Sequence, residues 1–390
     1  MPQAFPALAR AQVRELRSSL IREVANAGLG RHDVLAFWFG ESDQPTPAFI
    51  RETAARALTD GRTFYTHNLG RPDLRATLGA YLSGLHGTPI GSERLAVTSS
   101  GVSALMIAAQ ALVEPGDKVA VVTPVWPNVA EIPRILGARV TPVSLEPRSG
   151  RWSLDLDRLI DALTPDTRAL FLNSPNNPTG WTLAADDRQA ILDHCRRHGI
   201  WLLADDVYER LSFSPARSAP SFLPLADPHD RLVSTNSFSK AWRMTGWRLG
   251  WMVAPPELVE ALGVLLEYNT SCAPDFVQEG AIAALTQGEP HVAALRSELG
   301  AARDQVLAGL RALPGVEAPE PEGGMYAFFR LAGCKDSFTL AKTLVAEVGL
   351  GLAPGAAFGE EGEGWLRWCF AAGPEKNAAG LERLRSYLAR

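Results

Sequence analysis

The 390-residue sequence is poor in lysine, in cysteine and in long apolar runs. Only five lysines, at positions 118, 240, 335, 342 and 376, stand against a large excess of arginine. The four cysteines, Cys195, Cys272, Cys334 and Cys369, lie far apart and form no CxxC pair. This spacing signals neither a zinc site nor a disulfide framework, so we expect free thiols in a reducing compartment.

Composition and charge argue against a membrane-spanning protein and against a nucleic-acid-binding protein. No apolar run is long enough to cross a membrane, and a net charge of -5, with acids spread among the arginines, argues against a nucleic-acid surface. A hydrophobic content of 46% and a charged content of 21% are typical of a soluble globular protein of about two domains. Arg10, Arg14, Arg17 and Arg22 follow a helical pattern without the apolar segment of a secretory signal, so we expect a cytoplasmic protein.

His194 and His198 have the i, i+4 spacing of metal ligands on a helix. Arginines flank the pair, and the sequence places no acidic third ligand beside it. We therefore interpret the two histidines as a solvated helix end and expect no bound metal.

Residues 94–256 alternate short apolar or β-branched runs with longer helical patterns. Strands are predicted at 95–98, 118–123, 140–145, 169–173, 200–204, 232–236 and 249–254, and helices before 112, at 154–163 and at 184–198. This alternation predicts an α/β fold whose mostly parallel sheet is covered by helices on both faces. Stretches rich in proline and glycine at 314–324 and 354–364 indicate loops of a smaller C-terminal α+β region.

Clusters of polar and aromatic residues follow the predicted strands, at 99–101, 126, 173–180, 205–208 and 237–240. In sheets of this kind ligands bind beyond the carboxyl ends of the strands, so we expect these clusters to share one crevice. Asp205 ends a buried strand, where a carboxylate needs a cationic partner. Asp206 should point to the opposite face because side chains alternate along a strand.

Lys240 lies in a Ser-Phe-Ser-Lys run at 237–240, and Arg248 follows it. A lysine amine forms a Schiff base with the aldehyde of pyridoxal phosphate, while small hydroxyl residues and an arginine can hold its phosphate. The protonated pyridine nitrogen of this cofactor would supply the cation that Asp205 needs. Tyr208 could bond the phenolic oxygen and Trp126 could stack on the ring, but both could equally pack in the core.

In their order along the chain, these motifs resemble those of the class I aminotransferases, the aspartate aminotransferase-like branch of the fold-type I pyridoxal phosphate superfamily. The likeness covers nearly the whole chain and includes the segments 39–41, 64–70, 177–180, 205–208, 237–250 and 354–367. It implies a seven-stranded, mostly parallel sheet between helices in a large domain, residues 46–290. A smaller α+β domain would be built from residues 1–45 and 291–390.

The resemblance also implies a role for each matching residue around the cofactor. Lys240 would be the Schiff-base residue and the general acid/base, and Asp205 would bind the pyridine nitrogen. The ring would be stacked on Trp126, and its phenolic oxygen would be bound by Asn177 and Tyr208.

The implied phosphate and substrate contacts come from other segments. The phosphate would be held by Ser100, Gly101 and Val102, by Ser237 or Ser239, by Arg248, and by Tyr65 from the partner subunit of a homodimer. Arg367 would bind the α-carboxylate of the substrate, in a pocket that is also lined by Gly40, Trp126 and Asn177.

The implied reaction transfers an amino group between an amino acid and a 2-oxo acid. The stretch 249–295 has no lysine or arginine, and Val102 stands where some aspartate-using relatives have lysine. With the aromatic run at 37–39, these features favour a neutral or aromatic donor. Glutamate could still be the second substrate, bound by Arg31, Arg62 or Arg71.

The same fold is also compatible with elimination of a substituent from the β-carbon of the substrate. A carbon–sulfur β-lyase, or another α,β-eliminating enzyme, is the alternative, because motifs do not separate it from a transaminase. A non-catalytic ligand sensor is disfavoured, since the lysine, its aspartate and the arginines are all present.

Overall fold

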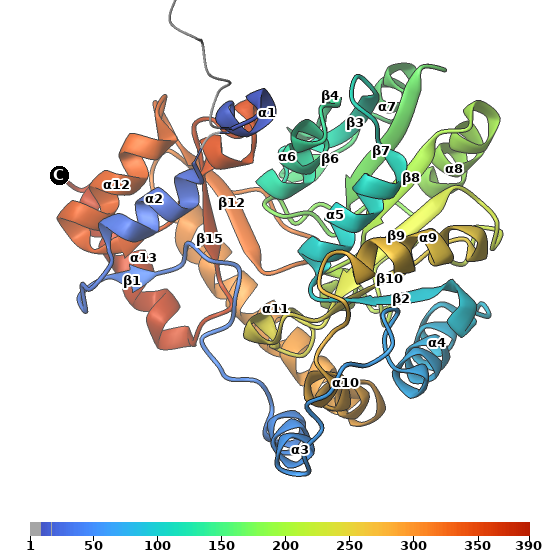
Figure 1. The fold of residues 1–390 in the computed structure, drawn as a ribbon. Coiled ribbons are helices and arrows are strands. Elements are labelled where there is room, and N and C mark those ends of the chain that lie inside the picture. Colours follow the sequence, from blue (N-terminus) through green and yellow to red (C-terminus); the bar gives the residue numbers. More distant parts are fainter. Residues whose placement is uncertain (1–8, 17) are drawn as a thin grey trace, which may run out of the picture.

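The computed structural model describes residues 9–16 and 18–390, and its centre is a seven-stranded sheet (Figure 1). In spatial order its strands are β2 (Leu95–Thr98), β10 (Gly250–Val253), β9 (Leu232–Ser237), β8 (Trp201–Asp205), β7 (Thr167–Asn173), β3 (Lys118–Thr123) and β4 (Arg139–Ser144). Neighbouring strands are parallel except at β10, which runs antiparallel to both β2 and β9. The predicted α/β fold with a mostly parallel sheet is confirmed.

Helices bury both faces of this sheet. One face packs against α5 (Gly101–Leu112), α6 (Pro127–Ile135) and α9 (Pro256–Glu267). The core on the other face includes side chains of α4 (Pro72–His86), α7 (Leu156–Ala162) and α8 (Asp187–His198). Within β3, Val119 and Val121 belong to the first core, and Ala120 and Val122 belong to the second. Burial on both faces explains why these strands are continuous apolar runs in the sequence.

A second, antiparallel sheet contains β11 (Val316–Glu317), β12 (Tyr326–Leu331), β15 (Trp365–Cys369) and β14 (Ala353–Pro354). Segments from the two ends of the chain meet beside it in a separate, parallel two-stranded sheet, in which β1 (Leu35–Ala36) pairs with β13 (Leu350–Gly351). In Figure 1 the blue helix α2 (Leu20–Ala27) lies beside the orange-red helix α12 (Ser337–Val348), and α13 (Pro374–Leu388) belongs to the same region. The domain division into 1–45, 46–290 and 291–390 stays a prediction.

The remaining elements connect or flank these two sheets. They are α1 (Ala11–Arg14), α3 (Ala48–Thr59), α10 (Asp275–Gln287), the long helix α11 (Glu289–Arg311), and a hairpin of β5 (Glu146–Arg148) and β6 (Arg151–Ser153). Helix α3 packs against α10. Within the ranges that the structure describes, no helix combines the length and the apolar character needed to span a membrane.

The structure corrects two local predictions. The N-terminal arginines do not share one helix: α1 ends at Arg14, and α2 begins at Leu20, where the hydroxyl of Ser19 caps it by accepting a hydrogen bond from the backbone N of Arg22 at 3.3 Å. Arg17 lies outside the described residues. His194 is not solvated but buried, with Nε2 at 2.7 Å from the backbone oxygen of Leu163, because α8 packs closely on the end of α7.

Candidate active site

A cavity of about 450 Å³ lies beyond the carboxyl ends of β7, β8 and β9, and residues of the second sheet close its other side. Twelve of the predicted site residues line it: Gly40, Gly101, Val102, Trp126, Asn177, Asp205, Tyr208, Ser237, Ser239, Lys240, Arg248 and Arg367. The predicted convergence of strand ends on one crevice is therefore confirmed. The roles assigned to the individual residues stay predictions.

Lys240 projects into this cavity from the turn after β9. Its Nζ donates a hydrogen bond to the backbone oxygen of Gly40 at 2.5 Å, and it lies 5.8 Å from the centre of the Tyr208 ring. Burial lowers the pKa of this amine to about 8, and the positive charges of Arg367 and Arg248 act in the same direction, against Cys369 and Glu41. A substantial fraction of the amine is therefore neutral near physiological pH, as a nucleophile or base must be.

Asp205, the last residue of β8, is buried at the bottom of the cavity. Burial raises the pKa of its carboxyl to about 7, while the backbone N–H of Val207, at 3.3 Å, and the charge of Lys240 oppose this rise. The neighbouring Asp206 faces the other side of the sheet, where it accepts a hydrogen bond from Ser234 at 2.6 Å. Of the two carboxylates, only that of Asp205 therefore faces the cavity. A cation placed beside it would stabilise its charged form, which burial disfavours.

Another part of the cavity wall is suited to an anion. Helix α5 begins at Gly101, and Ser100 caps it by accepting a hydrogen bond from the N of Ser103 at 3.0 Å. The hydroxyls of Ser237 and Ser239 lie 2.8 Å apart beside this helix end. A Cβ at Gly101 would lie only 3.1 Å from Cβ of Ser237, so glycine permits the close approach.

Arg248 completes this wall from the loop before β10. Its backbone is left-handed, with φ of 53°, and its side chain is exposed, with Nη1 at 2.6 Å from the backbone oxygen of Thr245. A helix N-terminus, two hydroxyls and a guanidinium together form a site that would bind a phosphate dianion.

Arg367 on β15 is the most deeply buried cation of the cavity, at 2% exposure. Its Nη1 donates to Oδ1 of Asn177 at 2.9 Å, Nη2 donates to the backbone oxygen of Trp38, and Nε has no partner among the described residues. A buried guanidinium with only neutral partners is costly unless an anion joins it. The arrangement favours a carboxylate ligand at this position.

The hydroxyls of Tyr208 and Tyr326 form a hydrogen bond of 2.7 Å at the cavity wall. Burial raises the pKa of both hydroxyls, so both stay protonated at neutral pH. The ring of Tyr326 also lies 4.5 Å from the guanidinium carbon of Arg367. This bond was not predicted from the sequence, because Tyr208 follows β8 of the large sheet whereas Tyr326 lies on β12 of the second sheet.

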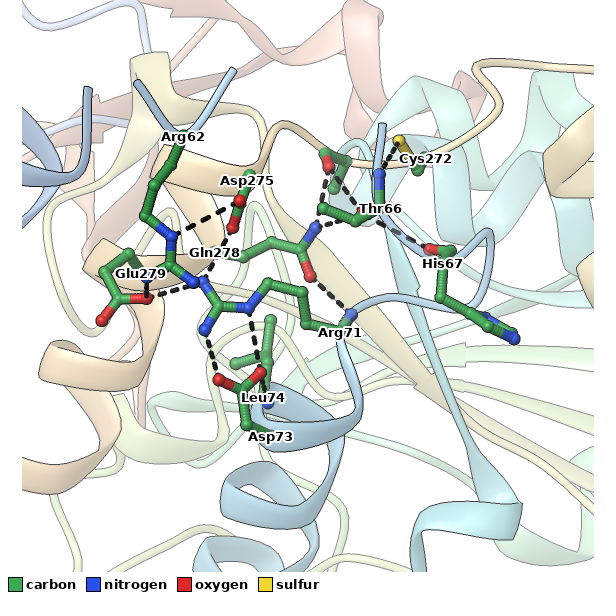
Figure 2. Close-up of polar contacts among 11 residues, drawn as sticks. Arg62, Thr66, His67, Arg71, Asp73, Leu74, Cys272, Asp275, Gln278 and Glu279 are labelled. Carbon is green, nitrogen blue, oxygen red and sulfur yellow. Dashed lines mark hydrogen bonds and ion pairs between the residues drawn. The ribbon is translucent and has the colours of Figure 1, made fainter. Parts of the chain in front are cut away.

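The three arginines proposed for a glutamate side chain lie elsewhere. Arg31 pairs with Asp33 at 2.6 Å. Figure 2 shows Arg62 and Arg71 sharing Asp275 and Glu279, with Arg62 at 2.5 Å from Glu279 and Arg71 at 2.8 Å from Asp275. None of the three lines the cavity. Their positive charges are already balanced by neighbouring carboxylates.

Tyr65 also lies off the cavity wall, and it is 89% exposed. The segment that carries it is nevertheless fixed. The backbone N of Thr66 donates to Sγ of Cys272 at 3.3 Å, and Nε2 of Gln278 donates to Oγ1 of Thr66 at 2.9 Å (Figure 2). Its neighbour Phe64 is 81% exposed. The structure thus holds two large aromatic side chains in water on an anchored segment.

Sequence reasoning missed the contribution of helix α2. Ser19, Ile21 and Arg22 all line the cavity. Arg22 was part of the N-terminal arginine pattern, but no local motif indicates that this helix lines a cavity built mainly by residues 101–248.

Comparisons with known proteins agree with this geometry. The model of the family described as aminotransferase class I and II matches residues 33–384. An aspartate aminotransferase of Pyrococcus horikoshii is 32% identical over 378 residues, which cover 96% of this chain and 95% of that protein.

Two solved structures are similar over nearly their whole length. A variant of the aspartate aminotransferase of Thermus thermophilus has a TM-score of 0.90 and 32% identity, and the match covers 98% of this chain and 100% of that one. An aromatic aminotransferase of Pyrococcus horikoshii has a TM-score of 0.86 and 30% identity, with 94% and 98% coverage.

Proposed function

The chain belongs to the class I and II aminotransferases, and we propose that it moves an amino group between a neutral or aromatic amino acid and a 2-oxo acid, with Lys240 as the residue that holds the cofactor. The enzyme is a pyridoxal phosphate-dependent transferase, as the members of this family are. The donor preference, the residue roles and the subunit arrangement are the parts that we propose.

The cavity fits this cofactor at three separate points. The amine of Lys240 can reach an aldehyde, the carboxyl of Asp205 lacks a full counter-charge, and the wall of Gly101, Ser237, Ser239 and Arg248 suits a phosphate. The observation that carries the proposal is the presence of these three complementary groups around one cavity. When bound, pyridoxal phosphate withdraws electrons from the α-carbon of the amino acid and so makes its proton labile.

The side chains of this chain would then position the substrate and move the proton. Arg367, held by Asn177 and the backbone of Trp38, binds the α-carboxylate and so fixes which bond of the α-carbon is aligned for cleavage. The neutral amine of Lys240 takes the α-proton and later returns it. Its hydrogen bond to Gly40 keeps it in the cavity between these two tasks.

The walls of the substrate side favour an uncharged side chain. Ile21, Phe39 and Tyr326 line the cavity. Phe39 adjoins Gly40, and the Tyr326 ring lies 4.5 Å from the guanidinium carbon of Arg367. Full burial of an aliphatic or aromatic side chain contributes roughly 1.5–3 kcal/mol. A neutral or aromatic donor is therefore the proposal that these walls support.

We also propose a homodimer in which Tyr65 of one protomer reaches the phosphate site of the other. Phe64, Tyr65 and Tyr268 are 81%, 89% and 87% exposed. Aromatic side chains of this kind are enriched where protein–protein interfaces cover them. Because the bond between Thr66 and Gln278 anchors the segment, Phe64 and Tyr65 are presented without a large ordering cost. A cytoplasmic location likewise remains a prediction.

The test is a titration of the purified holoenzyme with single amino acids and then with 2-oxo acids, followed through the visible absorption of the bound cofactor. Loss of the band with one amino acid, and its return with a 2-oxo acid, would support amino transfer and identify the donor. A persistent band with accumulation of ammonia and a 2-oxo acid from cysteine-type substrates would instead support the β-lyase. Absence of any band after addition of pyridoxal phosphate would contradict both.

A further inference from the structure

Tyr326 lines the active-site cavity but has no task in the proposed reaction. It is the first residue of β12 and is fully buried, and its hydroxyl lies 2.7 Å from that of Tyr208. Among residues 9–16 and 18–390, this hydroxyl has no other hydrogen-bond partner. Tyr208 is the residue that we propose for the phenolic oxygen of the cofactor.

The side chain of Tyr326 is fixed by its neighbours. Its ring lies 4.5 Å from the guanidinium carbon of Arg367, and it stands at 79° to the ring of Tyr208 with 5.7 Å between the ring centres. A Cβ at Gly40 would fall 1.9 Å from the hydroxyl oxygen, so the backbone of Gly40 packs directly against it. The hydroxyl is therefore held between Gly40 and Tyr208.

The two hydroxyls share one hydrogen bond but carry two hydrogens. Burial raises the pKa of both Tyr208 and Tyr326, so each hydroxyl keeps its hydrogen at neutral pH. A tyrosine hydroxyl donates one hydrogen and can also accept one. If the hydrogen of Tyr208 is directed at an acceptor in the cavity, the bond between the two tyrosines must use the hydrogen of Tyr326.

We infer that Tyr326 is a positioning residue whose hydroxyl donates to Tyr208, so that Tyr208 is left to donate its own hydrogen to the phenolic oxygen of pyridoxal phosphate. This inference rests on the cofactor site of the proposed function. A donor behind Tyr208 polarises its O–H bond and strengthens the hydrogen bond that this hydroxyl makes in turn. Tyr326 would thereby act on the cofactor without touching it.

The pH dependence of the visible absorption of the holoenzyme, without substrate, tests this chain of hydrogen bonds. The absorption changes when the nitrogen that joins the cofactor to Lys240 takes up a proton, and the nearby phenolic oxygen of the cofactor stabilises that proton. A hydrogen bond donated to this oxygen weakens the stabilisation, because it draws electron density away. Weakening that bond should therefore raise the pH midpoint of the absorption change.

The expected shifts follow from the strengths of the two bonds. Tyr208→Phe removes a bond to a charged oxygen and should raise the midpoint by about 1–2 pH units. Tyr326→Phe removes only the donor behind it and should raise the midpoint by about 0.3–0.6 of a pH unit. If Tyr326 acts through Tyr208, the same substitution made in the Tyr208→Phe protein should cause no further shift.

Tyr81→Phe is the matched control. The hydroxyl of Tyr81 also has a side-chain partner, Nη1 of Arg210, and its ring lies 5.6 Å from the guanidinium carbon of that arginine. Tyr81 does not line the cavity, so its substitution should leave the midpoint unchanged. All the variants keep the other charged and titratable groups near Tyr208, Tyr326 and Lys240, which are Glu41, Asp205, Arg248, Arg367 and Cys369.

The outcomes separate this inference from the proposed function. A rise in Tyr326→Phe that disappears in the Tyr208→Phe background supports the inference, whereas no rise, or an equal rise in both backgrounds, overturns it. If Tyr326→Phe does not fold, Gly40→Ala, which displaces the same hydroxyl, should give a rise with the same dependence on Tyr208. The measurement needs bound cofactor but no amino transfer. A holoenzyme that transfers no amino group would therefore refute the proposed function and leave this test decisive.

Discussion

The backbone oxygen of Gly40 accepts a hydrogen bond from Nζ of Lys240 at 2.5 Å, although the two residues lie 200 positions apart in the chain. A Cβ at Gly40 would fall 1.9 Å from the hydroxyl of Tyr326, which is itself bonded to Tyr208. Gly40 is thus the point where the N-terminal segment, the lysine turn and the second sheet touch. Only a residue without a side chain fits there.

Gly40→Ala should therefore impair the site directly. The added methyl group forces Tyr326 to move and breaks its bond to Tyr208, and such overpacking costs about 1–3 kcal/mol. We expect a loss of activity of tenfold or more together with a lower thermal midpoint, measured by steady-state kinetics and calorimetry. Gly84→Ala is the control, because a Cβ at Gly84 would meet no atom within 4 Å and the change favours helix α4. Equal activity of the two variants would contradict this reading of Gly40.

The lowered pKa of Lys240 predicts how the apoprotein captures its cofactor. Only the neutral amine attacks an aldehyde, so the capture rate should rise with pH and level off above about 8, the pKa that burial gives this amine. Stopped-flow absorbance between pH 6 and 10 would measure this profile. Lys240→Ala should abolish the borohydride-stable link between protein and cofactor. A capture rate that keeps rising to pH 10, as for an exposed lysine, would show that the amine is not desolvated.

The raised pKa of Asp205 predicts that its carboxyl destabilises the apoprotein. Between the unfolded value of 3.8 and the folded value of about 7, the unfolded chain loses this proton while the folded chain keeps it. The free energy of unfolding should therefore fall as pH rises through this window, by about 2–4 kcal/mol from this group.

Asp205→Asn removes that cost, and it also removes the carboxylate that we propose as the partner of the cofactor's pyridine nitrogen. Urea unfolding of the apoprotein at pH 8 should show the variant to be more stable than the parent, and the difference should shrink at pH 4, where both carry a neutral side chain. Cofactor dissociation should be faster in the variant. Asp60→Asn, at an exposed helix end, is the control. A variant that is less stable at pH 8 but still retains the cofactor would refute this assignment.

Hybrid dimers test whether Tyr65 acts across the subunit boundary. Tyr65→Ala and Lys240→Ala should each yield weakly active or inactive homodimers. In a hybrid of the two, one site would lack both residues and the other would contain both. Activity should therefore reappear when the two inactive proteins are mixed under conditions that exchange subunits. No recovery, with subunit exchange confirmed by mass, would place Tyr65 in its own protomer's site or outside any site.

Much of this site could be predicted because strands of a parallel sheet end at a common edge. Asp205, Ser237 and Lys240 follow directly from that rule once the apolar runs are recognised. Asp206 likewise faces the opposite side, as side-chain alternation requires. These positions depend on local periodicity, which the sequence carries within a few residues.

Other features depend on tertiary contacts that have no local signal. The arginine pattern near the N-terminus gave no sign that α1 ends at Arg14 and that α2 begins after Ser19, nor that Arg22 in the first turn of α2 lines the cavity. Nor did the sequence show that Arg62 and Arg71 share Asp275 and Glu279, from a helix about 200 residues later. The sequence alone does not show which arginines are free to bind a substrate, because a carboxylate far away in the chain can already pair with them.

The pairing of β1 with β13 joins the beginning and the end of the polypeptide in one small sheet region. Gly40 and Arg367, which we assign to the substrate, come from these terminal stretches. The residues assigned to the cofactor lie between 65 and 248, and among them Trp126 and Asn177 also line the substrate pocket. Substitutions near residues 40 and 367 are therefore expected to change which substrate binds while leaving the side chains that we propose for the cofactor in place.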